Sequence, residues 1–137
     1  MTKPRVLLVE DNAANLELVR YLLEAHGFEC EAATNGARAL QAARERTPAI
    51  VLCGLQVPDM DGFEVLRTIR DMPTMNGVPV IAVTAYAMVG DKERVLSAGF
   101  DGYIAKPIDP ARFAGQVAAF LGLPPPARIA PIGKPLA

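Results

Sequence analysis

Near its N-terminus the chain reads Val6-Leu7-Leu8-Val9-Glu10-Asp11, four apolar residues followed directly by two carboxylates. Two similar apolar runs follow at Ile50-Val51-Leu52-Cys53 and Val80-Ile81-Ala82-Val83. Strands that helices cover on both faces have this almost wholly apolar composition. A weak signal at residues 30–33 and a short run at residues 103–105 bring the number of predicted strands to five.

Between the strands, apolar residues recur with the 3.6-residue period of helices. Residues 16–23 and 63–69 each carry such an apolar face, and residues 89–98 form a weaker fourth helix. The last helix is predicted to start at Asp109-Pro110 and to end at Gly122, because aspartate caps a helix N-terminus and proline fits its first position. The alternation of strands and helices indicates an α/β fold around a parallel sheet.

The composition bounds the class of protein. With 137 residues, of which 51% are hydrophobic, the chain has the size and apolar content of one globular domain. Residues 1–123 are predicted to form it, followed by a proline-rich C-terminal tail at residues 124–137. Fourteen basic against fifteen acidic residues leave a net charge of −1, which disfavours nucleic acid and anionic membranes as partners.

The sequence also bears on location and redox chemistry. No apolar run approaches the roughly 20 residues of a membrane span, and the first residues lack a cleavable signal pattern. We therefore expect a cytoplasmic protein. Cys30 and Cys53 form no CxxC pair, so they predict neither a metal site nor a disulfide framework.

Polar residues at the ends of the predicted strands are the candidates for chemistry, because ligands of open parallel sheets bind at the carboxyl ends of the strands. Glu10 and Asp11 follow the first strand, Thr84 ends the fourth and Lys106 follows the fifth. Carboxylates suit Mg²⁺, whereas a lysine and a threonine hydroxyl suit phosphoryl oxygens. The third strand runs into Gly54, so this set lacks a nucleophile.

The residues at these strand ends fall into four motifs that resemble those of response-regulator receiver domains. They occur in the family's order and spacing over roughly residues 4–122: Val6-Leu7-Leu8-Val9-Glu10-Asp11-Asn12, Leu55-Gln56-Val57-Pro58-Asp59-Met60-Asp61-Gly62, Val83-Thr84-Ala85 and Tyr103-Ile104-Ala105-Lys106-Pro107. Single-domain regulators of the chemotaxis and cell-division type are the most similar, because no output domain follows. The resemblance implies a flavodoxin-like doubly wound sheet of five parallel strands in the order 2-1-3-4-5, with helices on both faces.

The resemblance also implies roles for individual residues. In the family, an acidic pair holds Mg²⁺ together with an aspartate at the end of the third strand, which accepts phosphate from a histidine kinase or phosphotransferase. The matching positions here are the metal ligands Glu10, Asp11 and the backbone carbonyl of Gln56, the switch residues Thr84 and Tyr103, and the phosphate-binding Lys106.

Gly54 stands where the family has its acceptor aspartate. Glycine has no side chain and can neither attack a phosphoryl donor nor bind a cation. We therefore expect no catalytic residue and no conventional phosphorylation. Mg²⁺ binding should be weak, and a water, an ion or the Lys106 ammonium should fill part of the vacated space.

Two other interpretations stay open. The chain could be a phosphorylatable receiver in which Asp59 or Asp61 is an irregular acceptor, or in which Gly54 is an engineered substitution of aspartate. Against the first, both aspartates are expected to shape a turn and cap the helix that begins near Gly62. Cys53 as a redox replacement is disfavoured, because strand alternation points it away from the side that residue 54 faces. A metabolic enzyme is disfavoured by the lack of a G-x-G-x-x-G or P-loop sequence.

The sequence thus predicts a pseudo-receiver, a protein-binding module of two-component signalling rather than an enzyme. Thr84 and Tyr103 remain although their covalent trigger is missing, so partner binding would bias the switch instead. The expected surface includes the fourth helix, fifth strand and fifth helix. The expected partner is a histidine kinase, a phosphotransferase or another signalling protein, and the chain is expected to be a monomer or weak homodimer.

Overall fold

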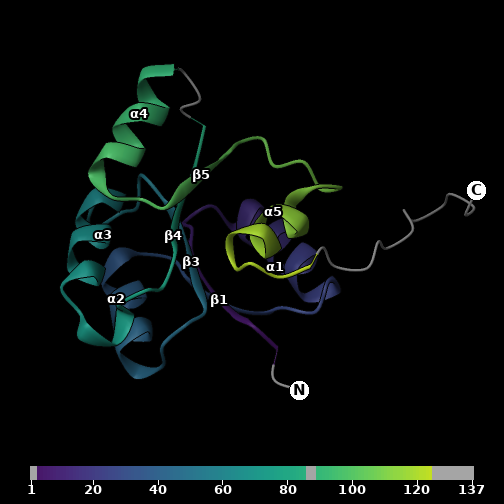
Figure 1. Ribbon diagram of the computed structural model, residues 1–137, viewed down its shortest axis with the longest axis horizontal. Coiled ribbons are helices and arrows are strands. Elements are labelled where there is room, and N and C mark those ends of the chain that lie inside the picture. The colour runs from purple at the N-terminus through teal and green to yellow at the C-terminus, as the bar shows by residue number, and fades with distance from the viewer. Residues whose placement is uncertain (1–2, 86–88, 125–137) are drawn as a thin grey trace, which may run out of the picture.

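The computed structural model describes residues 3–85 and 89–124. Within these residues, five parallel strands form one sheet in the order β2-β1-β3-β4-β5 (Figure 1). The strands are β1 (Arg5–Val9), β2 (Glu29–Ala33), β3 (Ile50–Gly54), β4 (Val80–Thr84) and β5 (Gly102–Ala105). The predicted strand order is confirmed, and each strand is one residue longer than the run that predicted it.

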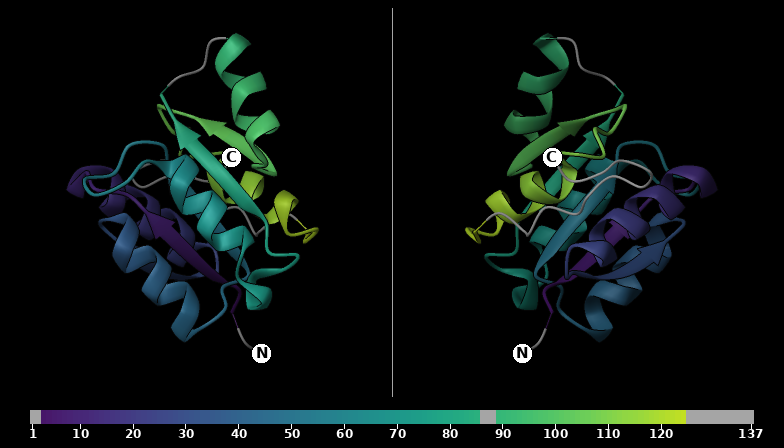
Figure 2. Two further views of the ribbon diagram at one scale, coloured as in Figure 1. Left: turned by 90° about the vertical axis from the view of Figure 1, so that its left-hand side faces the viewer. Right: turned by 90° about the vertical axis from the view of Figure 1, so that its right-hand side faces the viewer.

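Five α-helices of the described chain cover both faces of the sheet. They are α1 (Ala13–Ala25), α2 (Gly36–Glu45), α3 (Gly62–Arg70), α4 (Val89–Ala98) and α5 (Phe113–Phe120), with a short 3₁₀ helix η1 (Pro73–Met75). Helices α1 and α5 lie side by side on one face, and α2, α3 and α4 lie on the other (Figures 1 and 2). Among the described residues, no helix is long and apolar enough to cross a membrane.

The central strand β3 divides its side chains between the two faces. Ile50 and Leu52 pack toward α1 and α5, whereas Val51 and Cys53 pack toward α2, α3 and α4, and all four are fully buried. Since successive residues of a strand alternate between faces, Gly54 belongs to the α1 and α5 side. The prediction that Cys53 points away from the side of residue 54 is therefore confirmed.

The start of the last helix differs from the prediction. Helix α5 begins at Phe113 rather than at Pro110. The carboxylate of Asp109 accepts a hydrogen bond from the Ala111 backbone N–H at 3.0 Å, and its carbonyl accepts one from Phe113 N–H at 3.0 Å. Asp109 thus organises a turn that leads into α5, and proline fits the second position of such a turn as well as it fits a helix start. The glycine at the other end is correctly placed, since Gly122 follows α5 with a φ of +67°.

The predicted proline-rich tail falls outside this description from residue 125 onward. Its boundary at residue 124 stays a prediction.

Candidate functional site

The carboxyl ends of β1, β3, β4 and β5 meet at one edge of the sheet and bring the predicted site residues together. Glu10 directly follows β1, and its backbone N–H donates to Ala33 O at 3.0 Å. Lys106 directly follows β5, and its backbone N–H donates to Thr84 O at 2.8 Å. Each residue continues the hydrogen bonding of its strand, so the backbones of both are fixed by the sheet.

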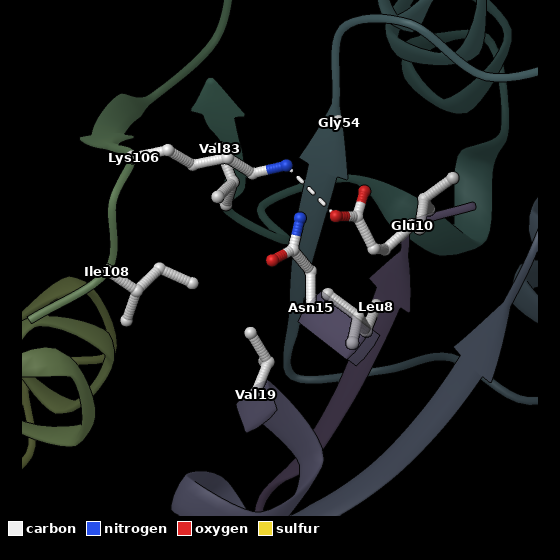
Figure 3. Close-up of a pocket in the computed structure, with 9 residues that line it drawn as sticks. Leu8, Glu10, Asn15, Val19, Gly54, Val83, Lys106 and Ile108 are labelled. Atoms are coloured by element: carbon white, nitrogen blue, oxygen red, sulfur yellow. Dashed lines mark hydrogen bonds and ion pairs between the residues drawn. The ribbon is translucent and has the colours of Figure 1, made fainter. Parts of the chain in front are cut away.

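An ion pair joins these two residues. Lys106 Nζ donates to Glu10 Oε1 at 2.9 Å (Figure 3). The Glu10 side chain is only 6% exposed and that of Lys106 is 24% exposed, so water screens the pair less than it screens a surface ion pair. Strands β3 and β4 lie between β1 and β5, and the pair therefore crosses above the ends of both.

Gly54 lies beneath this ion pair at the end of β3 (Figure 3). A Cβ atom at this position would be 3.2 Å from Val9 O and 3.5 Å from Glu10 Oε2. Any side chain on residue 54 would therefore extend toward the Glu10 carboxylate. The pocket at this point has a volume of about 10 Å³, which is near the room of one water molecule. It is lined by Leu8, Val9, Glu10, Asn15, Val19, Gly54, Val83, Lys106 and Ile108.

Asn15 is the lining residue that the sequence analysis missed. It lies in the first turn of α1, and its side-chain amide lies beside Glu10 and Lys106 (Figure 3). The preceding turn is set by Asn12, whose side chain caps α1 by accepting from Asn15 N–H at 3.0 Å. The helix cap at Asn12 was the signal that could have found it, because the cap fixes which first-turn residue faces the strand ends.

Asp59 and Asp61 both cap helices, but they cap different ones. Asp61 accepts from the Glu64 backbone N–H at 2.9 Å and caps α3, as predicted. Asp59 accepts from the N–H groups of Gly36 at 2.7 Å and Ala37 at 2.9 Å, so the prediction that it caps the helix near Gly62 is wrong. It bonds instead to the first turn of α2, a contact between segments more than 20 residues apart that no local pattern reveals.

A family model for the response regulator receiver domain matches residues 6–118 of the chain. The chain belongs to this family. Similar proteins include the polar-differentiation response regulator DivK of Brucella anthropi, which is 44% identical over 117 residues, or 85% of this chain and 95% of that protein. DivK of Brucella ovis is 43% identical over 122 residues, or 89% of this chain and 98% of that protein.

Solved receiver structures share the fold. The receiver domain of the sensor histidine kinase PA1611 from Pseudomonas aeruginosa PAO1 has a TM-score of 0.81 at 31% identity, covering 88% of this chain and 99% of that one. A CheY-like receiver domain protein from Methanospirillum hungatei JF-1 has a TM-score of 0.79 at 30% identity, covering 88% of this chain and 95% of that one. The predicted receiver fold is confirmed.

The Pseudomonas receiver domain holds a magnesium ion in its active-site cleft. The donor set of the present receiver does not fit such an ion. Asp11 is exposed, the carboxylate of Glu10 is paired with Lys106, and Gly54 offers no side chain. Within residues 3–85 and 89–124, no group of three or more His, Cys, Asp or Glu residues could hold a metal ion. Gln56, whose carbonyl is the implied third ligand, lies in the loop after β3 and forms an isolated bridge with Asp61.

The two residues that the motifs predict to be switch residues lie on β4 and β5. Thr84 ends β4 and is 3% exposed. Tyr103 lies on β5, pairs in register with Ala82, and packs half-buried against the core that α2, α3 and α4 cover. Both residues thus occupy the strand positions that the sequence motifs indicate, and their roles as switch residues stay predictions.

The Cys53 thiol is not placed to act as a nucleophile at this edge of the sheet. Its thiol donates to the Gly54 carbonyl at 3.3 Å and is packed on the other face of the sheet. Burial raises the pKa of this thiol to about 12, so it stays protonated and unreactive at neutral pH.

The cap made by Asp59 gives a prediction for acid stability. Hydrogen bonds from Ala37 and Gly36 lower the pKa of Asp59 in the folded state. Its stabilising effect is therefore complete above the unfolded-state pKa, near 3.9, and is lost as the pH falls through the lower folded-state pKa. We expect Asp59→Ala to lower the Tm at neutral pH, and the difference from the wild type to shrink in strong acid.

The control for this measurement is Asp71→Ala. Asp71 is an exposed aspartate and the C-cap residue of α3. Its removal should leave the Tm nearly unchanged at neutral pH and in strong acid. If Asp59→Ala lowered the Tm by the same amount in strong acid as at neutral pH, the result would contradict the capping role of Asp59.

Proposed function

We propose that this receiver is a protein-interaction module of two-component signalling that works without accepting phosphate. The observation that carries the proposal is Gly54 at the end of β3, in the position that the family motif assigns to the acceptor aspartate. The position is correctly oriented, since a Cβ there would lie 3.5 Å from Glu10 Oε2. Only the reactive group is missing, and a glycine has none to offer.

The nearby acidic and thiol groups do not supply a substitute. Both carboxylate oxygens of Asp59 accept hydrogen bonds from the first turn of α2, and Oδ1 of Asp61 accepts one from the first turn of α3. Glu10 is buried against Lys106, and Cys53 lies on the opposite face of the sheet. The capping hydrogen bonds of Asp59 and Asp61 support the proposal that neither aspartate of the β3–α3 loop is an irregular acceptor.

The proposed binding surface consists of α4, β5 and α5. Leu96 on α4 is an exposed large apolar side chain, at 42%, and Tyr103 on β5 is half-buried beside α4. The proposed partner is a cytoplasmic histidine kinase or phosphotransferase. By occupying a protein that would otherwise engage a phosphorylatable regulator, the chain would act by competition, and neither nucleic acid nor membrane is needed.

The proposal is tested by intact-protein mass spectrometry after incubation with Mg²⁺ and acetyl phosphate. We expect no added phosphoryl group on the wild-type chain while a receiver with an aspartate at the end of its third strand is labelled in parallel. A phosphoryl group on the wild-type chain would overturn the proposal, and its position would identify the true acceptor.

A second assay addresses competition. Purified wild-type chain is added to a histidine kinase and the conventional receiver that it phosphorylates, all from the organism that encodes the chain. The rate of phosphoryl transfer from the kinase to that receiver should fall as the concentration of the added chain rises. A matched Leu96→Asp variant should inhibit less, because it places a charge on the proposed surface, and equal inhibition by both forms would contradict the assignment of the surface.

A further inference from the structure

The Glu10 carboxylate is buried, and the free-energy cost of burying its charge has to be compensated by the groups around it. The residue is 5% exposed, and its backbone is held against β2 by the hydrogen bond to Ala33 O. A carboxylate removed from water is costly unless a positive group or several N–H donors compensate it.

Lys106 is positioned to supply that compensation. Its ammonium donates to Glu10 Oε1 at 2.9 Å, and its backbone is fixed by the hydrogen bond to Thr84 O. The two side chains together reach across three strand spacings, from β1 to β5, a span of roughly 14 Å at the usual separation of neighbouring strands. Both residues must therefore extend over the end of β3.

The end of β3 is where Gly54 lies. A side chain at residue 54 would enter the gap that the ion pair crosses, since its Cβ would already be 3.5 Å from Glu10 Oε2. A carboxylate there would repel Glu10 and compete with it for the ammonium. Because Gly54 has no side chain, Glu10 is the acidic residue that Lys106 contacts in the described chain.

We propose that the Lys106 ammonium is a built-in counter-charge for Glu10, which takes the place of a divalent cation and clamps the ends of β1 and β5 together. This inference rests on the proposed function and deepens it, because it says how the site is held without metal or phosphate. The clamp is present whether or not Mg²⁺ or a phosphodonor is available. The receiver is thereby kept in one arrangement of these strand ends.

The test is a double-mutant cycle measured by urea unfolding of the full chain. The single variants are Lys106→Met, which keeps most of the length of the side chain without its charge, and Glu10→Gln. If the two residues acted independently, the losses of stability in the single variants would add in the double variant. We expect instead that the folding equilibrium constant of the double variant is at least about tenfold higher than this additive value, because the two side chains form a coupled, partly buried pair. Additive losses, with no coupling, would overturn the proposal.

A second arm uses only the wild-type chain, so it remains decisive if a variant does not fold. The Tm is measured in millimolar MgCl₂ and in NaCl of equal ionic strength, and we expect the same value in both. A Tm that rises with MgCl₂ alone would show that a divalent cation still binds and stabilises the folded chain, and it would overturn the proposal. Lys92→Met, which removes an exposed charge on α4, is the matched control and should show no coupling with Glu10→Gln.

These outcomes are separate from those that test the proposed function. A chain that stays unlabelled by acetyl phosphate but shows additive losses in the cycle would lack the clamp and still be a phosphate-independent module. A labelled chain with strong coupling would retain the clamp and lose the proposed function.

Discussion

Aspartate at position 54 is expected to convert this receiver into one that accepts phosphate. In Gly54→Asp the new carboxylate would extend from a Cβ that lies 3.5 Å from Glu10 Oε2 and 3.2 Å from Val9 O. The Val9 contact is tight, so the backbone carbonyl of Val9 must move by a few tenths of an ångström to accommodate the new side chain. The carboxylate would join Glu10 and Asp11 in a set of oxygen donors that suits Mg²⁺, and it would place a nucleophile at the end of β3.

The measurement is the intact mass after incubation with Mg²⁺ and acetyl phosphate. Gly54→Asp should gain one phosphoryl group and the wild type none. The control is Gly54→Asn, which has nearly the same shape without a carboxylate and should stay unlabelled. Phosphorylation of all three proteins would place the acceptor elsewhere, and an unlabelled but folded Gly54→Asp would show that the remaining residues no longer form a working site.

The same variant should also change the response to metal. Without a divalent cation, a third carboxylate beside Glu10 adds repulsion, so Gly54→Asp should be less stable than the wild type. With Mg²⁺ bound to the folded form, stability should recover in proportion to the occupancy of the ion. This behaviour would contrast with the metal-insensitive wild type that the Lys106 clamp predicts.

The second large effect is expected at Gly62, the first residue of α3. A Cβ there would lie 2.5 Å from the carbonyl oxygen of Gly54 and 2.9 Å from Leu55 Cα. Both are backbone atoms, which cannot rotate out of the way. The two segments are also joined by a hydrogen bond from Gly62 N–H to Leu55 O at 2.8 Å. We expect Gly62→Ala to destabilise the fold by about 3 kcal/mol, at the upper end of overpacking effects.

Gly115→Ala in α5 is the matched control. A Cβ at Gly115 meets no atom within 4 Å, and alanine is the better helix former, so this variant should be more stable by about 0.5–1 kcal/mol. Urea unfolding of both variants measures the two effects. Equal stability of Gly62→Ala and Gly115→Ala would show that the close approach at the start of α3 is not a constraint.

The strands were predictable because their apolar runs record burial on both faces of the sheet. Ile50, Val51 and Leu52 are all fully buried, although they pack on opposite sides. Strand order and the identity of the site came from the resemblance to receivers instead, since no apolar pattern specifies which strands are neighbours. The start of α5 was placed too early, because Asp109-Pro110 is equally compatible with a turn.

The missed parts of the site depend on contacts between distant segments. Asp59 caps α2 from the loop after β3, and its sequence surroundings point only to the nearer α3. The choice of Glu10 as the partner of Lys106 likewise requires the positions of β1 and β5 in the sheet. The sequence predicts a water, an ion or the Lys106 ammonium as the group that lies beside residue 54, and only the folded structure pairs the ammonium with Glu10.

The close packing of Gly62 on residue 54 has an evolutionary consequence. The start of α3 rests on the main-chain carbonyl of residue 54, whereas the Cβ position of that residue faces Glu10 on the other side. Packing thus uses the backbone of this residue and chemistry uses its side chain, so selection can act on the two separately. Two of the four glycine codons differ from an aspartate codon by a single base. One mutation could therefore turn a phosphate relay into a competitor, or reverse the change, in a lineage that keeps the same folded domain throughout.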